Sequence, residues 1–171
     1  LTAGGPCSNF NRACALMCAK LGVTMHLVEY TDNLEDFDKS LNYKLCQLSG
    51  IKTTRCEKSC VQETIASVIN SYSSQRVRFV YGGGKSIEGF SAYYEAVKEL
   101  YDDNIPIDCL FVACGTGTTL TGICAGMQKY YPKSKVYAIS VARSLEDEMP
   151  VLLDNMNSFN SLLGHNYDFS N

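Results

Sequence analysis

The sequence has 171 residues, of which 46% are hydrophobic and 19% are charged, and its formal net charge is -3. A chain of this length and composition can bury a core and is typical of a soluble globular protein. The acidic balance and the scattered basic residues argue against a nucleic-acid partner. No hydrophobic run approaches the ~18 residues of a membrane-spanning helix, so we expect no membrane partner.

Helical periodicity and β-rich runs alternate along the chain. In chain order, the pattern predicts a helix at 9–21, a strand at 24–30, a helix at 33–48, a strand at 51–56, a helix at 59–72, a strand at 77–81, a helix at 87–102, a strand at 108–114, a helix at 118–130, a strand at 136–142 and a helix at 146–163. This alternation is typical of an α/β protein with parallel twisted sheets and helices on both faces. A polar break at 71–75 predicts a domain junction, with one domain over 1–75 and another over 76–171.

The sequence contains nine cysteines but no C-x-x-C pair, and its only histidines are His26 and His165. Zinc sites need tighter pairs or more histidines, so we expect no metal. We interpret the cysteines as reduced core residues. The start of the chain lacks the features of an export signal, which favours a cytoplasmic location.

Three glycine-bearing turns, at 2–13, 81–89 and 113–122, should lie at the carboxyl ends of strands, where α/β proteins bind ligands. The second turn contains Gly84-Lys85-Ser86, which matches the end of the nucleotide-binding P-loop pattern. A P-loop also needs glycine where this chain has Phe79, because its backbone must wrap phosphates without side-chain clashes. We therefore interpret this turn as a glycine-rich connection to a helix.

The third turn carries the clearest binding chemistry, because a buried strand leads into Gly115-Thr116-Gly117-Thr118-Thr119 and then into a helix. Backbone amides at a helix N-terminus favour an anion, and threonine hydroxyls add donors. The turn is not a dinucleotide fingerprint, since Leu120 stands where that pattern needs glycine. We expect a phosphate site here, and tight packing is the alternative explanation of the glycines.

Three segments together resemble one enzyme family. GTGTTLTG (115–122) resembles the phosphate loop of fold-type-II pyridoxal-phosphate enzymes, the group that includes cysteine synthase. GGPCSNFNRACALMCAKLG (4–22) and YGGGKSIEGFSAYYEAVKEL (81–100) are similar to signatures of the aminocyclopropane-carboxylate deaminase and D-cysteine desulfhydrase branch. The segments occur in family order across nearly the whole chain. The resemblance implies a two-domain fold like that of the tryptophan synthase β subunit, present here in part.

The resemblance also implies roles for individual residues. Asn9 matches an asparagine that hydrogen-bonds the ring oxygen of pyridoxal 5′-phosphate, and Ser8 matches a catalytic-site serine near the substrate carboxylate. Phe10 departs from the family, whose members usually carry a polar residue there. The phosphate would be bound by Gly115, Thr116, Gly117, Thr118 and Thr119, where Thr118 replaces the usual glycine. From the residues alone, Ser8 and Asn9 are better explained as a cap of the first helix.

The lysine that links the cofactor in this family would precede Leu1, so we expect the chain to be the central part of a longer enzyme. Residues 1–75 would belong to its smaller domain, and residues 76–171 to its larger, cofactor-binding domain. The implied function is a pyridoxal-phosphate-dependent lyase or deaminase that acts on a small amino acid and releases ammonia and a keto acid. A homodimer is also implied. The alternatives are a β-replacement synthase, a non-catalytic binding domain, and a nucleotide-binding protein using Lys85.

Overall fold

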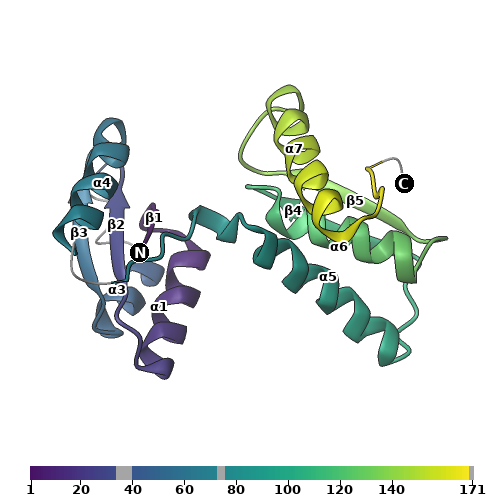
Figure 1. Ribbon diagram of the computed structural model, residues 1–171, viewed down its shortest axis with the longest axis horizontal. Coiled ribbons are helices and arrows are strands. Elements are labelled where there is room, and N and C mark those ends of the chain that lie inside the picture. Colours follow the sequence, from purple (N-terminus) through teal and green to yellow (C-terminus); the bar gives the residue numbers. More distant parts are fainter. Residues whose placement is uncertain (34–39, 73–75, 170–171) are drawn as a thin grey trace. The chain divides into compact units, whose positions relative to one another are not determined.

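A computed structural model describes residues 1–33, 40–72 and 76–169. The chain forms two compact units, Leu1–Gly82 and Gly83–Asn171. In the colouring of Figure 1, the first unit runs from purple to teal and the second from teal to yellow. The division falls later in the chain than the junction proposed from the polar break, because residue 80 pairs with the first unit's sheet. The assignment of these units to a smaller and a larger domain stays a prediction.

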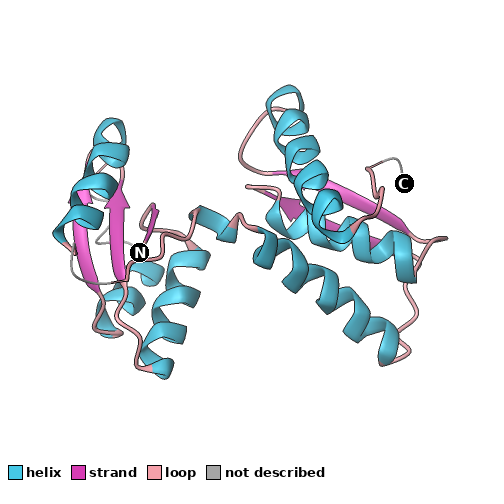
Figure 2. Cartoon of the chain, in the orientation of Figure 1, coloured by secondary structure: helices cyan, strands magenta, loops and turns pink. Residues whose placement is uncertain are grey.

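The first unit contains a parallel three-stranded sheet in the order β1-β2-β3. Figure 2 distinguishes its strands from its helices. Its elements are β1 (Thr2–Gly4), α1 (Asn9–Leu21), β2 (His26–Tyr30), α3 (Leu41–Leu48), β3 (Lys52–Cys56), the 3-10 helix η1 (Lys58–Cys60) and α4 (Val61–Ser71).

Helices cover both faces of this sheet, because side chains of the central strand alternate between two cores. Leu27 packs with Ala15 of α1 and Cys46 of α3 on one face. Val28 packs with Ile65 and Val68 of α4 on the other. The α/β class and the parallel pairing expected from the sequence are therefore confirmed in this unit.

The strand predicted at 77–81 is wrong. Within this segment the structure has a single parallel bridge, between Val80 and Thr2. The Thr2 hydroxyl donates a hydrogen bond to the Val80 carbonyl at 2.6 Å. Gly83 then turns the chain with a φ of 70°. The short strand β1 was not predicted. For the helix predicted at 33–48, residues 34–39 lie outside the described residues, and the helix observed nearby is α3.

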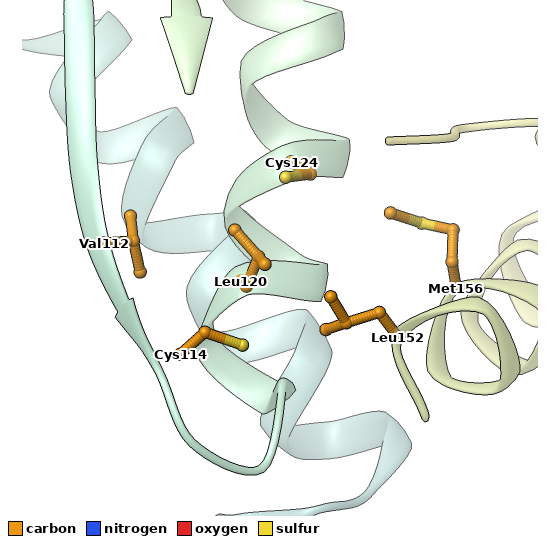
Figure 3. Close-up of a cluster of buried hydrophobic side chains, with 6 residues drawn as sticks. All are labelled: Val112, Cys114, Leu120, Cys124, Leu152 and Met156. Carbon is orange, nitrogen blue, oxygen red and sulfur yellow. The ribbon is translucent and has the colours of Figure 1, made fainter. Parts of the chain in front are cut away.

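The 3-10 helix η2 (Gly82–Gly84) spans the boundary between the units. The second unit contains α5 (Ile87–Asp102), β4 (Cys109–Cys114), α6 (Thr118–Tyr130), β5 (Lys135–Ser140) and α7 (Leu145–Leu163). Strands β4 and β5 pair in parallel, with Val112 opposite Ala138. One face of this pair packs on α6 and α7. Figure 3 shows the core formed there by Val112, Cys114, Leu120, Cys124, Leu152 and Met156.

Helix α6 approaches α5 closely because it has glycine at the contact. A Cβ on Gly122 would lie 2.2 Å from the Phe90 carbonyl oxygen, and one on Gly126 would lie 2.8 Å from Val97 Cβ. The opposite face of the β4–β5 pair is exposed, and there Phe111 and Tyr137 stack with ring centroids 4.9 Å apart. No helix in the described ranges is long and apolar enough to cross a membrane.

Candidate functional site

The turn after β1 places Ser8 and Asn9 at the start of helix α1. Ser8 is the N-cap, and its Oγ accepts a hydrogen bond from the Asn11 amide at 3.1 Å. This confirms the capping explanation drawn from the residues alone. A hydroxyl has one donor and two acceptor positions, so the cap leaves the Ser8 O–H able to donate. Asn9 is the first helical residue and is exposed, and Phe10 is half-buried.

Glycine at the end of β1 makes room for a buried amide. The side chain of Asn11 is buried and donates from Nδ2 to the Gly5 carbonyl at 3.3 Å. A Cβ on Gly4 would lie 2.6 Å from that same nitrogen. The first glycine-rich turn thus depends on close packing against Asn11.

The loop from β4 to α6 turns its carbonyl groups toward the body of the second unit. Arg143 donates to the Gly115 carbonyl at 2.8 Å, and Asn155 Nδ2 donates to the Thr116 carbonyl at 3.2 Å. The Gly117 carbonyl accepts from the amide and the hydroxyl of Thr121, each at 2.9 Å. Three successive carbonyls are therefore held by protein donors.

The other side of this loop has the character of an anion site. Gly117 is the N-cap of α6 in the left-handed conformation, at φ 77°, and within the described part of the chain no side chain caps the first amides of α6. The hydroxyls of Thr116 and Thr118 lie 3.0 Å apart, and a Cβ on Gly115 would meet no atom within 4 Å. Uncapped amides at a helix N-terminus, neighbouring hydroxyls and open space together suit a phosphate group.

An ion pair between the exposed Arg143 and the buried Glu148 supports this loop. Glu148 of α7 is 1% exposed and lies 3.0 Å from Arg143, the same guanidinium that bonds Gly115. The thiol of Cys114 donates to Glu148 at 3.5 Å. Burial, and then the Glu148 carboxylate, raise the pKa of Cys114 to about 11. Cys114 is thus a protonated donor at neutral pH, and the pair positions the loop backbone.

The second glycine-rich turn has a packing role in the structure. Ser86 caps α5 by accepting from the Gly89 amide at 3.1 Å, and Lys85 lies 3.5 Å from Asp154 of α7. A Cβ on Gly83 would lie 2.4 Å from the Thr116 hydroxyl oxygen. The absence of a side chain at Gly83 therefore leaves room for Thr116 in the loop between β4 and α6.

Sequence reasoning located the two turns but missed the side chains that hold them. Asn42 donates to the Cys7 carbonyl at 2.8 Å, and Ser40 donates to the Pro6 carbonyl at 2.7 Å. A serine before a helical run is an N-cap signal, so Ser40 could have been identified as the cap of α3. No local signal marks Asn42, Arg143 or Asn155, which reach their partners only through the fold. Among the residues that the structure describes, no group of three or more His, Cys, Asp or Glu could hold a metal ion.

The fold and these two turns define a class of protein, and comparison with known proteins agrees. The model of the family "Pyridoxal-phosphate dependent enzyme" matches residues 2–161, so the chain belongs to this family. The anion site of the Gly115–Thr119 loop fits the phosphate of that cofactor in its donors and its open space.

Individual relatives point to the branch. The chain is 26% identical over 162 residues to the D-cysteine desulfhydrase of Klebsiella pneumoniae subsp. pneumoniae, which covers 88% of this chain and 48% of that protein. The same figures hold for the D-cysteine desulfhydrase of Serratia proteamaculans. A crystal structure of an ACC deaminase homologue matches at a TM-score of 0.82 and 26% identity, over 98% of this chain and 52% of the other. These matches confirm the branch that the motifs indicated.

More distant structures share the fold alone. A serine racemase from Dictyostelium discoideum matches at a TM-score of 0.66 with 16% identity, over 96% of this chain and 48% of that one. The chain spans about half the length of the curated relatives that it matches.

Proposed function

We propose that the full-length protein is a pyridoxal-phosphate-dependent lyase or deaminase that acts on a small amino acid and releases ammonia and a keto acid. The observation that carries this proposal is the family match over residues 2–161, which includes the turn at Ser8 and Asn9 and the Gly115–Thr119 loop. The relatives named D-cysteine desulfhydrase and ACC deaminase homologue support the substrate class. We propose in addition a cytoplasmic homodimer, as the resemblance implies.

Under this proposal the chain's residues divide the binding work. The loop Gly115, Thr116, Gly117, Thr118 and Thr119 holds the phosphate through backbone amides and hydroxyls. Asn9 donates a hydrogen bond to the ring oxygen, and Ser8 donates its remaining O–H to the substrate carboxylate. When bound, pyridoxal phosphate supplies a ring that draws electrons from the substrate's α-carbon.

Thr118 fits the loop although relatives carry glycine there. Its side chain is 1% exposed and its hydroxyl bonds Thr116 within the loop. The added Cβ is thus packed inside the second unit, and the loop's open space lies at Gly115. This replacement leaves room for the phosphate.

The test uses the full-length protein mixed with pyridoxal phosphate, reduced with borohydride and weighed by mass spectrometry. We expect one reduced cofactor per chain, and keto acid formation from D-cysteine or 1-aminocyclopropane-1-carboxylate. A bound cofactor with cysteine formation from O-acetylserine and sulfide would favour a β-replacement synthase instead. Absence of an adduct would contradict the enzyme and favour a binding domain.

A variant of the Gly115–Thr119 loop tests the phosphate assignment by comparing its effects on stability and on cofactor affinity. Gly115→Ala places a methyl group in open space, so it should leave the cofactor-free protein as stable as the wild type. The same methyl group would occupy the proposed phosphate position, and we expect cofactor affinity to fall about tenfold or more, equivalent to at least ~1.4 kcal/mol. Unchanged affinity would contradict the phosphate assignment of this loop.

A further inference from the structure

A chain of three polar side chains links helix α1 to helix α3 at the first turn. The guanidinium of Arg12 donates to Asn42 Oδ1 at 3.0 Å. Asn42 Nδ2 donates to the Cys7 carbonyl at 2.8 Å and to Asn9 Oδ1 at 3.1 Å. Both hydrogens of the Asn42 amide are therefore in use, and its oxygen is also bonded.

The chemistry of these partners fixes which way each amide faces. An arginine guanidinium only donates and a backbone carbonyl only accepts, so the Asn42 amide cannot be reversed without losing both contacts. Its nitrogen must then face Asn9. Because two amide nitrogens cannot bond each other, Asn9 presents its oxygen to Asn42. The contact with Asn42 uses the oxygen of Asn9, so the Nδ2 group of this exposed residue, its donor end, lies outside the contact.

The start of α3 is tied to the same turn, which keeps this geometry in place. Ser40 is 7% exposed and donates to the Pro6 carbonyl at 2.7 Å. Its oxygen also accepts from the Tyr43 amide at 3.2 Å and so caps α3. Asn42 thus stands near the start of a helix that Ser40 anchors to Pro6, the residue next to Cys7.

We propose that Asn42, held by Arg12, is a positioning residue that orients the Asn9 amide so that it offers a hydrogen-bond donor to an anionic oxygen. The inference rests on the proposed function, in which that oxygen belongs to the ring of pyridoxal phosphate. A donor at this position stabilises the anionic form of the ring oxygen, whereas an acceptor would repel it. Under this proposal the orientation of Asn9 is set through Asn42, by the Arg12 guanidinium and the Cys7 carbonyl.

The central test is Asn42→Asp in the full-length protein. Aspartate has the same shape and keeps an ion pair with Arg12, but it only accepts, so Asn9 must reverse and present Oδ1 to the ligand. We expect pyridoxal phosphate to bind about tenfold or more weakly. We also expect the absorption of the bound cofactor to change at a higher pH than in the wild type. Asn42→Ala, which frees Asn9 to take either orientation, should have a smaller effect on both readouts.

A double-variant comparison separates orientation from structural damage. Both Asn42 variants lose the contact with the Cys7 carbonyl. Only a change in the orientation of the Asn9 amide, however, would affect cofactor binding through the Asn9 side chain. In an Asn9→Ala background, Asn42→Asp should therefore leave the remaining cofactor affinity within twofold. If Asn42→Asp prevents folding, Arg12→Met replaces it, since this change keeps the Cys7 contact and should give an effect between those of the wild type and Asn9→Ala.

The outcomes distinguish failure of the positioning role from failure of the proposed function. A wild-type protein that does not bind pyridoxal phosphate overturns both. A wild-type protein that binds it while Asn42→Asp and Asn42→Ala give equal affinities and spectra overturns the positioning role alone. An effect of Asn42→Asp that persists undiminished without the Asn9 amide also overturns it.

Discussion

Alanine at Gly117 should strongly destabilise the second unit. This residue adopts φ 77°, and a Cβ there would lie 2.6 Å from Leu152 Cδ2 and 2.8 Å from Asn155 Nδ2. Both neighbours are buried on α7, at 5% and 0% exposure, so neither can turn aside into solvent. Asn155 also holds the Thr116 carbonyl, and its displacement would break that bond.

The size of the effect follows from three separate costs. A left-handed conformation costs a non-glycine residue roughly 1–2 kcal/mol. Overfilling a packed core costs about 1–3 kcal/mol, and a lost hydrogen bond costs about 1 kcal/mol. The unfolded chain loses entropy when glycine becomes alanine, which offsets about 0.4–1 kcal/mol. We therefore expect a net destabilisation of about 2–6 kcal/mol.

Two other glycines serve as matched controls. Gly164, at the end of α7, has φ 65° with nothing within 4 Å of a Cβ, so its alanine variant should show the backbone cost alone, roughly 1 kcal/mol. Gly115 lies in the same loop as Gly117 but has no positive φ and open space around it. Gly115→Ala should therefore be neutral or slightly stabilising.

Hydrogen–deuterium exchange of the full-length protein, followed by mass spectrometry, measures the loss locally. For Gly117→Ala, exchange in α6 and α7 should be about 30-fold faster or more, which corresponds to at least ~2 kcal/mol. Exchange in α1 should not change. Equal effects of Gly117→Ala and Gly164→Ala would refute the packing argument. A Gly115→Ala effect as large as that of Gly117→Ala would refute the dependence on Cβ space.

Two further predictions concern titratable groups. Burial raises the pKa of Glu29, partly offset by Arg55, so the folded state binds this proton more tightly than the unfolded chain. The resulting stability is present below the ordinary carboxyl pKa and is lost as pH rises through the raised pKa. Glu29→Gln should therefore stabilise the protein at pH 7 but not at pH 4. A difference in unfolding midpoint between variant and wild type that does not change with pH would contradict this. Burial also raises the pKa of Cys124 to about 12 and, with Glu148, that of Cys114 to about 11. Iodoacetamide at pH 8 should thus label the exposed Cys60 and spare both, as read by peptide mass spectrometry, and equal labelling would refute their burial.

Local patterns predicted the long elements well because those elements have their own hydrophobic periodicity and caps. Helices α1, α5 and α6 were predicted with the observed bounds, and each begins at a Ser or Gly cap. Short pairings were not predictable in this way. Strand β1 has three residues and forms only because β2 lies beside it, and the β-rich run at 77–81 contributes a single bridge because its pairing edge is short.

The candidate site shows the same limit. Glycine and threonine spacing identified the Gly115–Thr119 loop, because a helix N-terminus after a buried strand is a local feature. The groups that hold its carbonyls come from positions 28 and 39 residues further on, and no pattern in the sequence connects them. Resemblance supplied Ser8 and Asn9, while Asn42 became visible only when α3 was placed against the turn.

The close contact between α5 and α6 has a consequence for the stability of the phosphate loop. Helix α6 carries two glycines and three threonines among its 13 residues, and glycine weakens a helix by about 1 kcal/mol relative to alanine. A peptide with this sequence would be mostly unfolded in water, since short helices need packing to persist. The amides that would receive the phosphate therefore depend on the packing of α5 against Gly122 and Gly126. A variant that loosens the contact between α5 and α6 would therefore weaken cofactor binding without touching the loop itself.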